Sequence, residues 1–82
     1  MTRSAHLLLK LRKKHDLTQK ELAKKLKMNH HQSVGLIEKG QVLIPTRVMK
    51  ALAEVSGLPL KQIVKIHMQD KLDVLMSRLN ND

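Results

Sequence analysis

The stretch MNHHQSVGLIEKG, residues 28–40, holds the side chains of this 82-residue chain that are best suited to chemistry. His30, His31 and Gln32 stand directly ahead of Ser33, and an apolar pattern then leads to Gly40. Three kinds of site fit these residue types. They are a metal centre, a catalytic histidine–serine pair, and the polar edge of a helix that contacts nucleic acid.

The first two kinds of site lack partners. Adjacent histidines on a helix diverge by about 100°, so His30 and His31 cannot both face one ion. No carboxylate is spaced to complete a metal site, and no acid is expected to orient a histidine beside Ser33. The chain has no Cys, which removes thiolate ligands and thiol nucleophiles. We therefore expect no metal, no cofactor and no enzyme activity; solvent-exposed turn histidines without a function remain an alternative.

Net charge points to a polyanionic partner. The formal charge is +9, and residues 1–28 hold nine basic against two acidic side chains. Simple solubility and a basic helix on a membrane surface are alternatives. The absence of Phe, Tyr and Trp argues against stacking platforms for single-stranded nucleic acid. No apolar run approaches the roughly 18 residues of a membrane span and no signal peptide pattern is present, so we expect a cytoplasmic protein.

Apolar residues recur with helical periodicity nearly throughout, which predicts an all-α fold in a single domain. The core is expected at about 4–66 and a helical extension at about 67–80. Five helices are expected, at about 4–15, 19–26, 30 or 31 to 39, Pro45 to 56, and 58 to about 79.

The second and third of these helices form a recognisable pair. Thr18 and Glu21 have the spacing of a capping box, and Gly40 is a helix stop. Two short helices joined by a tight turn, the first one basic, describe a helix-turn-helix. In that motif the second helix enters the DNA major groove by its N-terminal end.

The run LRKKHDLTQKELAKKL, residues 11–26, resembles the phage-repressor (lambdoid repressor/Cro, XRE-type) helix-turn-helix family, whose pattern reads LR…LTQ..LA..L. Gln32-Ser33-Val34, Ile37-Glu38-x-Gly40 and Pro45 continue the likeness, which covers roughly residues 7–66. It implies a repressor-like fold and a small transcriptional repressor or regulator that binds double-stranded DNA. One departure is Lys27, where the family has glycine, in a turn longer by one residue. We expect Asn29 to supply the left-handed conformation instead, and the register of the reading residues stays open by one position.

The resemblance also implies roles for individual residues. His31 and Gln32 correspond to the base-reading start of the second helix, with His30 and Gly35 as neighbours; glutamine can pair with adenine N6 and N7. Arg12 and Glu38 resemble a structural ion pair. Phosphate contacts are expected from Lys10, Lys13, Lys14, Gln19, Lys20, Lys24, Lys39 and Gln41.

The C-terminal segment carries an apolar stripe of Val64, Met68, Leu72, Leu75 and Leu79, spaced for one helix face. We expect Met68, Leu72, Leu75 and Leu79 to form the interface of a homodimer on an inverted-repeat operator, with Val42-Leu43-Ile44 joining it. The helix folding back on its own domain is the alternative. Two other functions remain open: an antitoxin that binds DNA and uses this helix to hold a toxin, and a protein-interaction module without DNA binding.

Overall fold

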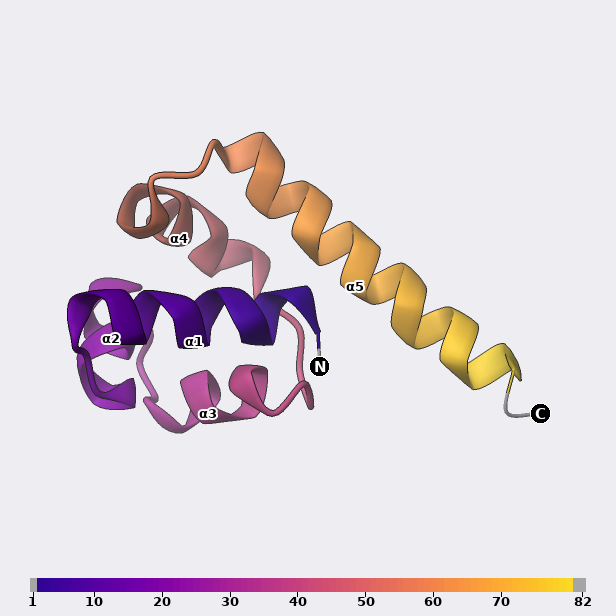
Figure 1. Cartoon of the computed structure of the whole chain (residues 1–82), viewed down its shortest axis with the longest axis horizontal. Coiled ribbons are helices and arrows are strands. Elements are labelled where there is room, and N and C mark those ends of the chain that lie inside the picture. The colour runs from indigo at the N-terminus through magenta and orange to yellow at the C-terminus, as the bar shows by residue number, and fades with distance from the viewer. Residues whose placement is uncertain (1, 81–82) are drawn as a thin grey trace.

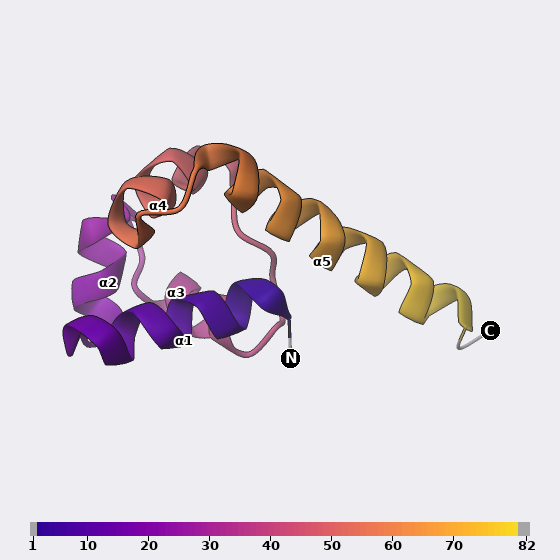
Figure 2. The same ribbon diagram turned by 45° about the horizontal axis from the view of Figure 1, so that its top comes forward.

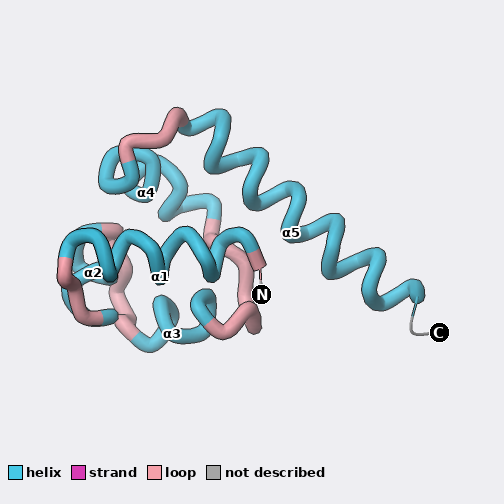
Figure 3. Tube along the Cα trace, in the orientation of Figure 1, coloured by secondary structure: helices cyan, strands magenta, loops and turns pink. Residues whose placement is uncertain are grey.

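Five α-helices make up the architecture of residues 2–80, the part of the chain that the computed structural model describes (Figure 1, Figure 3). A short 3-10 turn, η1, precedes the fourth helix, and these residues contain no strand. The expected all-α, five-helix fold is therefore confirmed. The helices are α1 (Arg3–His15), α2 (Gln19–Lys25), α3 (Gln32–Glu38), α4 (Met49–Ser56) and α5 (Leu60–Asn80), and η1 is Thr46–Val48.

Helix α3 packs on both α1 and α2, while α4 and the start of α5 close the other side of the core. Figure 2 shows α5 leaving this core and running well past it toward the C-terminus. The interior is aliphatic, as expected for a chain without aromatic residues. Its largest fully buried apolar side chains are Leu8, Leu22, Leu26, Val34, Ile37, Ile44, Val48, Leu52 and Ile63.

Helices α1, α2 and α3 end in the same way. A residue with positive φ follows the last turn, and the next amide donates to the carbonyl five residues before it. The three residues are Asp16, Lys27 and Gly40, with φ of 52°, 59° and 75°. This ending satisfies carbonyls that the helix itself leaves without donors, and it turns the chain sharply toward the next helix.

The expectation for Asn29 is wrong, because Lys27 itself holds the left-handed conformation. The Met28 amide donates to the Ala23 carbonyl at 2.9 Å, and that hydrogen bond requires positive φ at the residue between Leu26 and Met28. A non-glycine residue pays roughly 1–2 kcal/mol for this backbone. The side chain of Met28 is already buried, so the turn is complete before the chain reaches Asn29.

Several helix boundaries also differ from expectation. Helix α3 begins at Gln32 and ends at Glu38, inside the expected range. Pro45 does not open α4; its ψ of 142° makes it the extended residue before η1, and α4 begins at Met49. Ile44, expected to help cover a dimer interface, is buried in the core instead and is not available for that contact.

Helix α5 is 21 residues long, about 30 Å at the rise of an α-helix. The apolar stripe is exposed along it, so within residues 2–80 the helix does not fold its stripe back on its own domain. Among these residues no helix combines the length and apolarity needed to cross a membrane. We call residues 71–80 distal α5.

Candidate nucleic-acid interface

The start of α2 is fixed by the expected capping box. The Glu21 amide donates to Thr18 Oγ1 at 3.0 Å, and the Thr18 amide donates to Glu21 Oε1 at 2.9 Å. The hydrogen bond from the Thr18 backbone, followed by that of its side chain, lowers the pKa of the Glu21 carboxyl below its ordinary value. The basic helix α2 therefore begins at a defined residue with a carboxylate at its N-terminus.

Buried aliphatic side chains hold α2 against α3. Leu22 of α2 and Leu26, the residue that caps its C-terminal end, meet the same core as Val34 and Ile37 of α3. Ala23 is buried as well. The small Ala23 side chain allows the two short helices to approach closely. This packing leaves the opposite side of α3 facing solvent.

An ion pair ties α1 to the end of α3. Arg12 Nε donates to Glu38 Oε2 at 2.7 Å and Arg12 Nη2 donates to Glu38 Oε1 at 3.1 Å, a bidentate arrangement. The Glu38 side chain is only 6% exposed, so its charge needs this partner. Arg12 Nη1 also donates to the Leu17 carbonyl at 3.3 Å. Arg12 and Glu38 thus form an ion pair at the two positions where the family resemblance implied one.

Gln19 joins this network from the first position of α2. Its Nε2 donates to Glu38 Oε1 at 2.9 Å, so the side chain lies over α3. A Cβ at Gly35 would lie 3.3 Å from both terminal atoms of the Gln19 amide, tighter than an ordinary contact. Packing therefore explains the glycine at position 35, because the absence of a side chain leaves room for the Gln19 amide. Its expected role near the bases stays a prediction, as does the phosphate contact of Gln19.

The N-terminal end of α3 is open to solvent. His30, His31 and Gln32 are all exposed, and the face that continues from Gln32 carries Leu36 and Lys39, four and seven residues on. Leu36 is 38% exposed. Reasoning from the sequence missed it, although its position off the buried stripe of Val34 and Ile37 was a usable signal. An apolar side chain here can contact a thymine methyl group.

The expected phosphate-binding residues come from three parts of the fold. All except Gln19, which is half-buried, are exposed, so their amino and amide groups are accessible. Lys10, Lys13 and Lys14 lie on α1; Lys20 and Lys24 lie on α2; Lys39 and Gln41 follow the end of α3. No group of three or more His, Asp or Glu side chains within residues 2–80 is arranged to hold a metal ion.

A capped basic helix, a tight turn and a second helix with an exposed polar N-terminal end define a helix-turn-helix DNA-binding domain. Comparison with protein families agrees: the model of the helix-turn-helix family matches residues 8–63. The chain belongs to that family, in its phage-repressor-like, XRE-type form, and is in general class a DNA-binding transcription regulator. Comparisons with curated proteins and with solved structures gave no match.

Proposed function

We propose that the chain is a sequence-specific regulator, acting as a repressor, that binds double-stranded DNA as a homodimer on an inverted repeat. The exposed N-terminal end of α3, ahead of a face with Leu36 and Lys39, is the observation that carries the proposal. A helix presented in this way fits the major groove with its first residues at the base edges. Repression follows when the bound protein occupies the DNA that polymerase needs.

Each part of this surface has a distinct role in the proposal. Gln32, with His31 and His30 beside it, reads base edges, and a bidentate contact to adenine discriminates by roughly 1–3 kcal/mol. Leu36 packs on a thymine methyl. Lys39 and Gln41 contact phosphates at the far end of α3. The lysines of α1 and α2 supply attraction that depends on salt and is blind to sequence.

The homodimer is supported by the exposure of the apolar stripe. Met68, Leu72, Leu75 and Leu79 each keep between 50% and 60% of their surface in solvent. Covering half of such a side chain stabilises by about 1 kcal/mol, and a two-fold interface counts every contact twice. Two copies would place their α3 helices in successive major grooves about 34 Å apart.

Selection from random duplexes tests the proposal, because it reports the site and its symmetry together. An inverted repeat is the expected result, and a single asymmetric half-site would contradict the homodimer.

The Gln32→Ala variant tests base reading. It should lose about tenfold in affinity for the selected site and nothing on unrelated DNA. Gln62→Ala, an exposed glutamine on α5, is the matched control and should behave as wild type. Equal loss on all sequences would refute the role of Gln32.

A second candidate function is that of an antitoxin, and one observation favours it. A groove between residues 40–43 and α5 has a mostly apolar lining, to which Lys71 and Arg78 add two basic side chains. Its apolar side chains are Val42, Leu43, Val74 and Leu75. Such a groove can hold part of another protein. A small stoichiometric partner that co-purifies from the native host would support the antitoxin. Absence of DNA binding even at low salt would favour an interaction module instead.

A further inference from the structure

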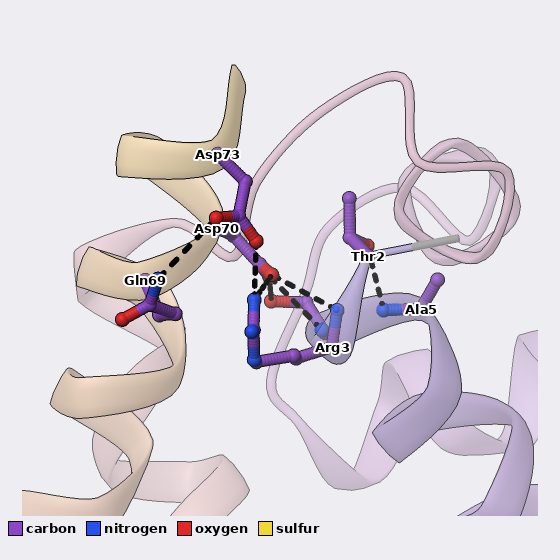
Figure 4. Close-up of polar contacts among 7 residues, drawn as sticks. Thr2, Arg3, Ala5, Gln69, Asp70 and Asp73 are labelled. Atoms are coloured by element: carbon purple, nitrogen blue, oxygen red, sulfur yellow. Dashed lines mark hydrogen bonds and ion pairs between the residues drawn. The ribbon is translucent and has the colours of Figure 1, made fainter. Parts of the chain in front are cut away.

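A buried carboxylate in the middle of α5 is not explained by DNA binding. Asp70 is 1% exposed, and its side chain meets the first turn of α1 (Figure 4). The Arg3 amide donates to Oδ1 at 2.9 Å, and the Ser4 amide donates to Oδ2 at 3.0 Å. The Ser4 hydroxyl also donates to Oδ2. Every oxygen of this carboxylate therefore has a donor from α1.

The start of α1 needs these acceptors. The first amides of a helix have no partner within it, and the positive end of the helix dipole favours an anion. Thr2 Oγ1 accepts from the Ala5 amide at 3.0 Å, which leaves the Arg3 and Ser4 amides to Asp70. An ionised carboxylate is costly to bury without hydrogen bonds. The hydrogen bonds of Asp70 therefore fix one position of α5 relative to the first turn of α1, whereas an apolar contact tolerates small shifts between helices.

Asp70 is one of two buried contacts that α5 makes with the rest of the domain. Ile63 and Asp70 are the only buried side chains that α5 contributes within residues 60–80. They are seven residues apart, about 10 Å along the helix axis. Two buried points fix the direction of a rigid helix more closely than Ile63 alone, because the remaining contacts of α5 with α1 are half-buried or exposed. The exposed stripe lies beyond and beside these points.

We propose that Asp70 is a positioning residue that sets the direction of α5 against the helix-turn-helix, and through it the spacing of the two DNA half-sites. The inference rests on the proposed homodimer. Leu75 lies about 18 Å beyond Ile63 along the axis, so a tilt of about 10° moves it by about 3 Å. Two-fold symmetry doubles this to about 6 Å, nearly two base pairs at about 3.4 Å each.

Asp70→Asn is the direct test, because it keeps the shape and turns one acceptor into a donor that faces donors. Binding is measured on duplexes in which two inverted half-sites are separated by spacers lengthened one base pair at a time. Wild type should bind one spacer at least about a hundredfold more tightly than its neighbours, since linked binding is lost when geometry forbids it. Asp70→Asn should show less than about tenfold preference, with unchanged affinity for a single half-site.

Asp73→Asn is the matched control. Asp73 lies on the same helix and also contacts Arg3, but its side chain is 55% exposed. The variant removes the same charge without touching the buried contact, so its spacer preference should equal that of wild type. A loss of preference as large as that of Asp70→Asn would assign the effect to charge and overturn the proposal.

A second measurement reads the position of α5 without DNA. The chain has no native Cys, so Lys14→Cys and Ser77→Cys can carry spin labels on α1 and distal α5, diluted with unlabelled protein. The distance distribution should be narrow in wild type and broad with Asp70→Asn. A narrow distribution in the variant, or a broad one with the wild-type spacer preference, would overturn the proposal.

Two further outcomes are a wild type that binds only single half-sites and an Asp70→Asn variant that does not fold. If wild type binds only single half-sites, the homodimer is wrong and the spacing role falls with it, while the distance distribution still decides whether Asp70 fixes α5. If Asp70→Asn does not fold, Ser4→Ala replaces it, because it removes one donor and keeps the carboxylate. Ser4→Ala should weaken the spacer preference and broaden the distance distribution, both by less than Asp70→Asn was expected to. If neither changes, the role of Asp70 is refuted.

Discussion

The leucines of the helical core and those of distal α5 differ in their exposure to solvent. Leu8, Leu22 and Leu52 have no exposed surface, whereas Leu72 and Leu79 keep half or more of theirs in solvent. The first group makes the domain stable by itself. The second adds little to that stability and, in the proposed homodimer, contacts the other copy. In that proposal, stability and assembly are carried by different parts of the chain.

Two leucines test this division with the largest expected effect. Leu22→Ala should lower the free energy of unfolding by about 3 kcal/mol, because it opens a cavity in the core. Leu72→Ala should change it by no more than about 0.5 kcal/mol in dilute protein. Urea unfolding followed by circular dichroism measures both, since the chain has no Trp or Tyr for fluorescence. Equal losses would show that the stripe belongs to the core of a single chain.

Two carboxylates extend the comparison to ion pairs. Glu38→Ala should lower the free energy of unfolding by about 2 kcal/mol, because the Arg12 side chain, three-quarters buried, is left without its charged partner. Asp73→Ala removes an exposed pair with Arg3 and should leave the unfolding midpoint unchanged. Urea midpoints of the two variants measure these changes. A Glu38→Ala variant as stable as wild type would show that the ion pair does not stabilise the fold.

A third prediction concerns strain inside the helix-turn-helix. Lys27→Gly should raise the free energy of unfolding by about 0.5 kcal/mol, since relief of the left-handed backbone exceeds the added entropy of the unfolded chain. Asn29→Gly, at a residue without positive φ, should give no gain. Thermal unfolding of the two variants separates them. A gain at residue 29 and none at residue 27 would reverse the assignment of the turn.

The smallest effect is a dependence on pH. The capping hydrogen bonds lower the pKa of Glu21 in the folded chain, so its contribution to stability is present above the ordinary pKa and is lost as pH falls toward the lowered one. Glu21→Gln should therefore unfold at a lower temperature than wild type at pH 7, and the two should converge in acid. Melting curves across this range measure the convergence; a constant difference would contradict the assignment.

Much of the fold was predictable because its signals are local. Thr18 and Glu21 fix the start of α2, Gly40 and Gly57 stop two helices, and apolar periodicity marks the buried faces. The pair of Arg12 and Glu38 followed from the family resemblance and is present. The candidate base-reading residues at the start of α3 are exposed, but their contact with DNA stays a prediction.

The misses have physical causes that the type of a single residue does not reveal. Lysine carries no signal for a left-handed backbone, and Lys27 adopts it because Met28 must reach Ala23. Ile44 resembled Val42 in the sequence, yet only the packing of the core separates a buried residue from an exposed one. No local signal in the sequence marks Asp70, because its partners are 66 and 67 positions away.

That separation has a consequence for how the chain is made. The helix-turn-helix can form while synthesis continues, since its turns close over five residues and synthesis proceeds from the N-terminus. The first turn of α1 must wait, because its acceptor, the Asp70 carboxylate, is added 66 residues after Ser4. A nascent chain therefore completes the first turn of α1 after the α2–α3 pair, and products truncated before residue 70 should keep that pair folded while the first turn of α1 is frayed.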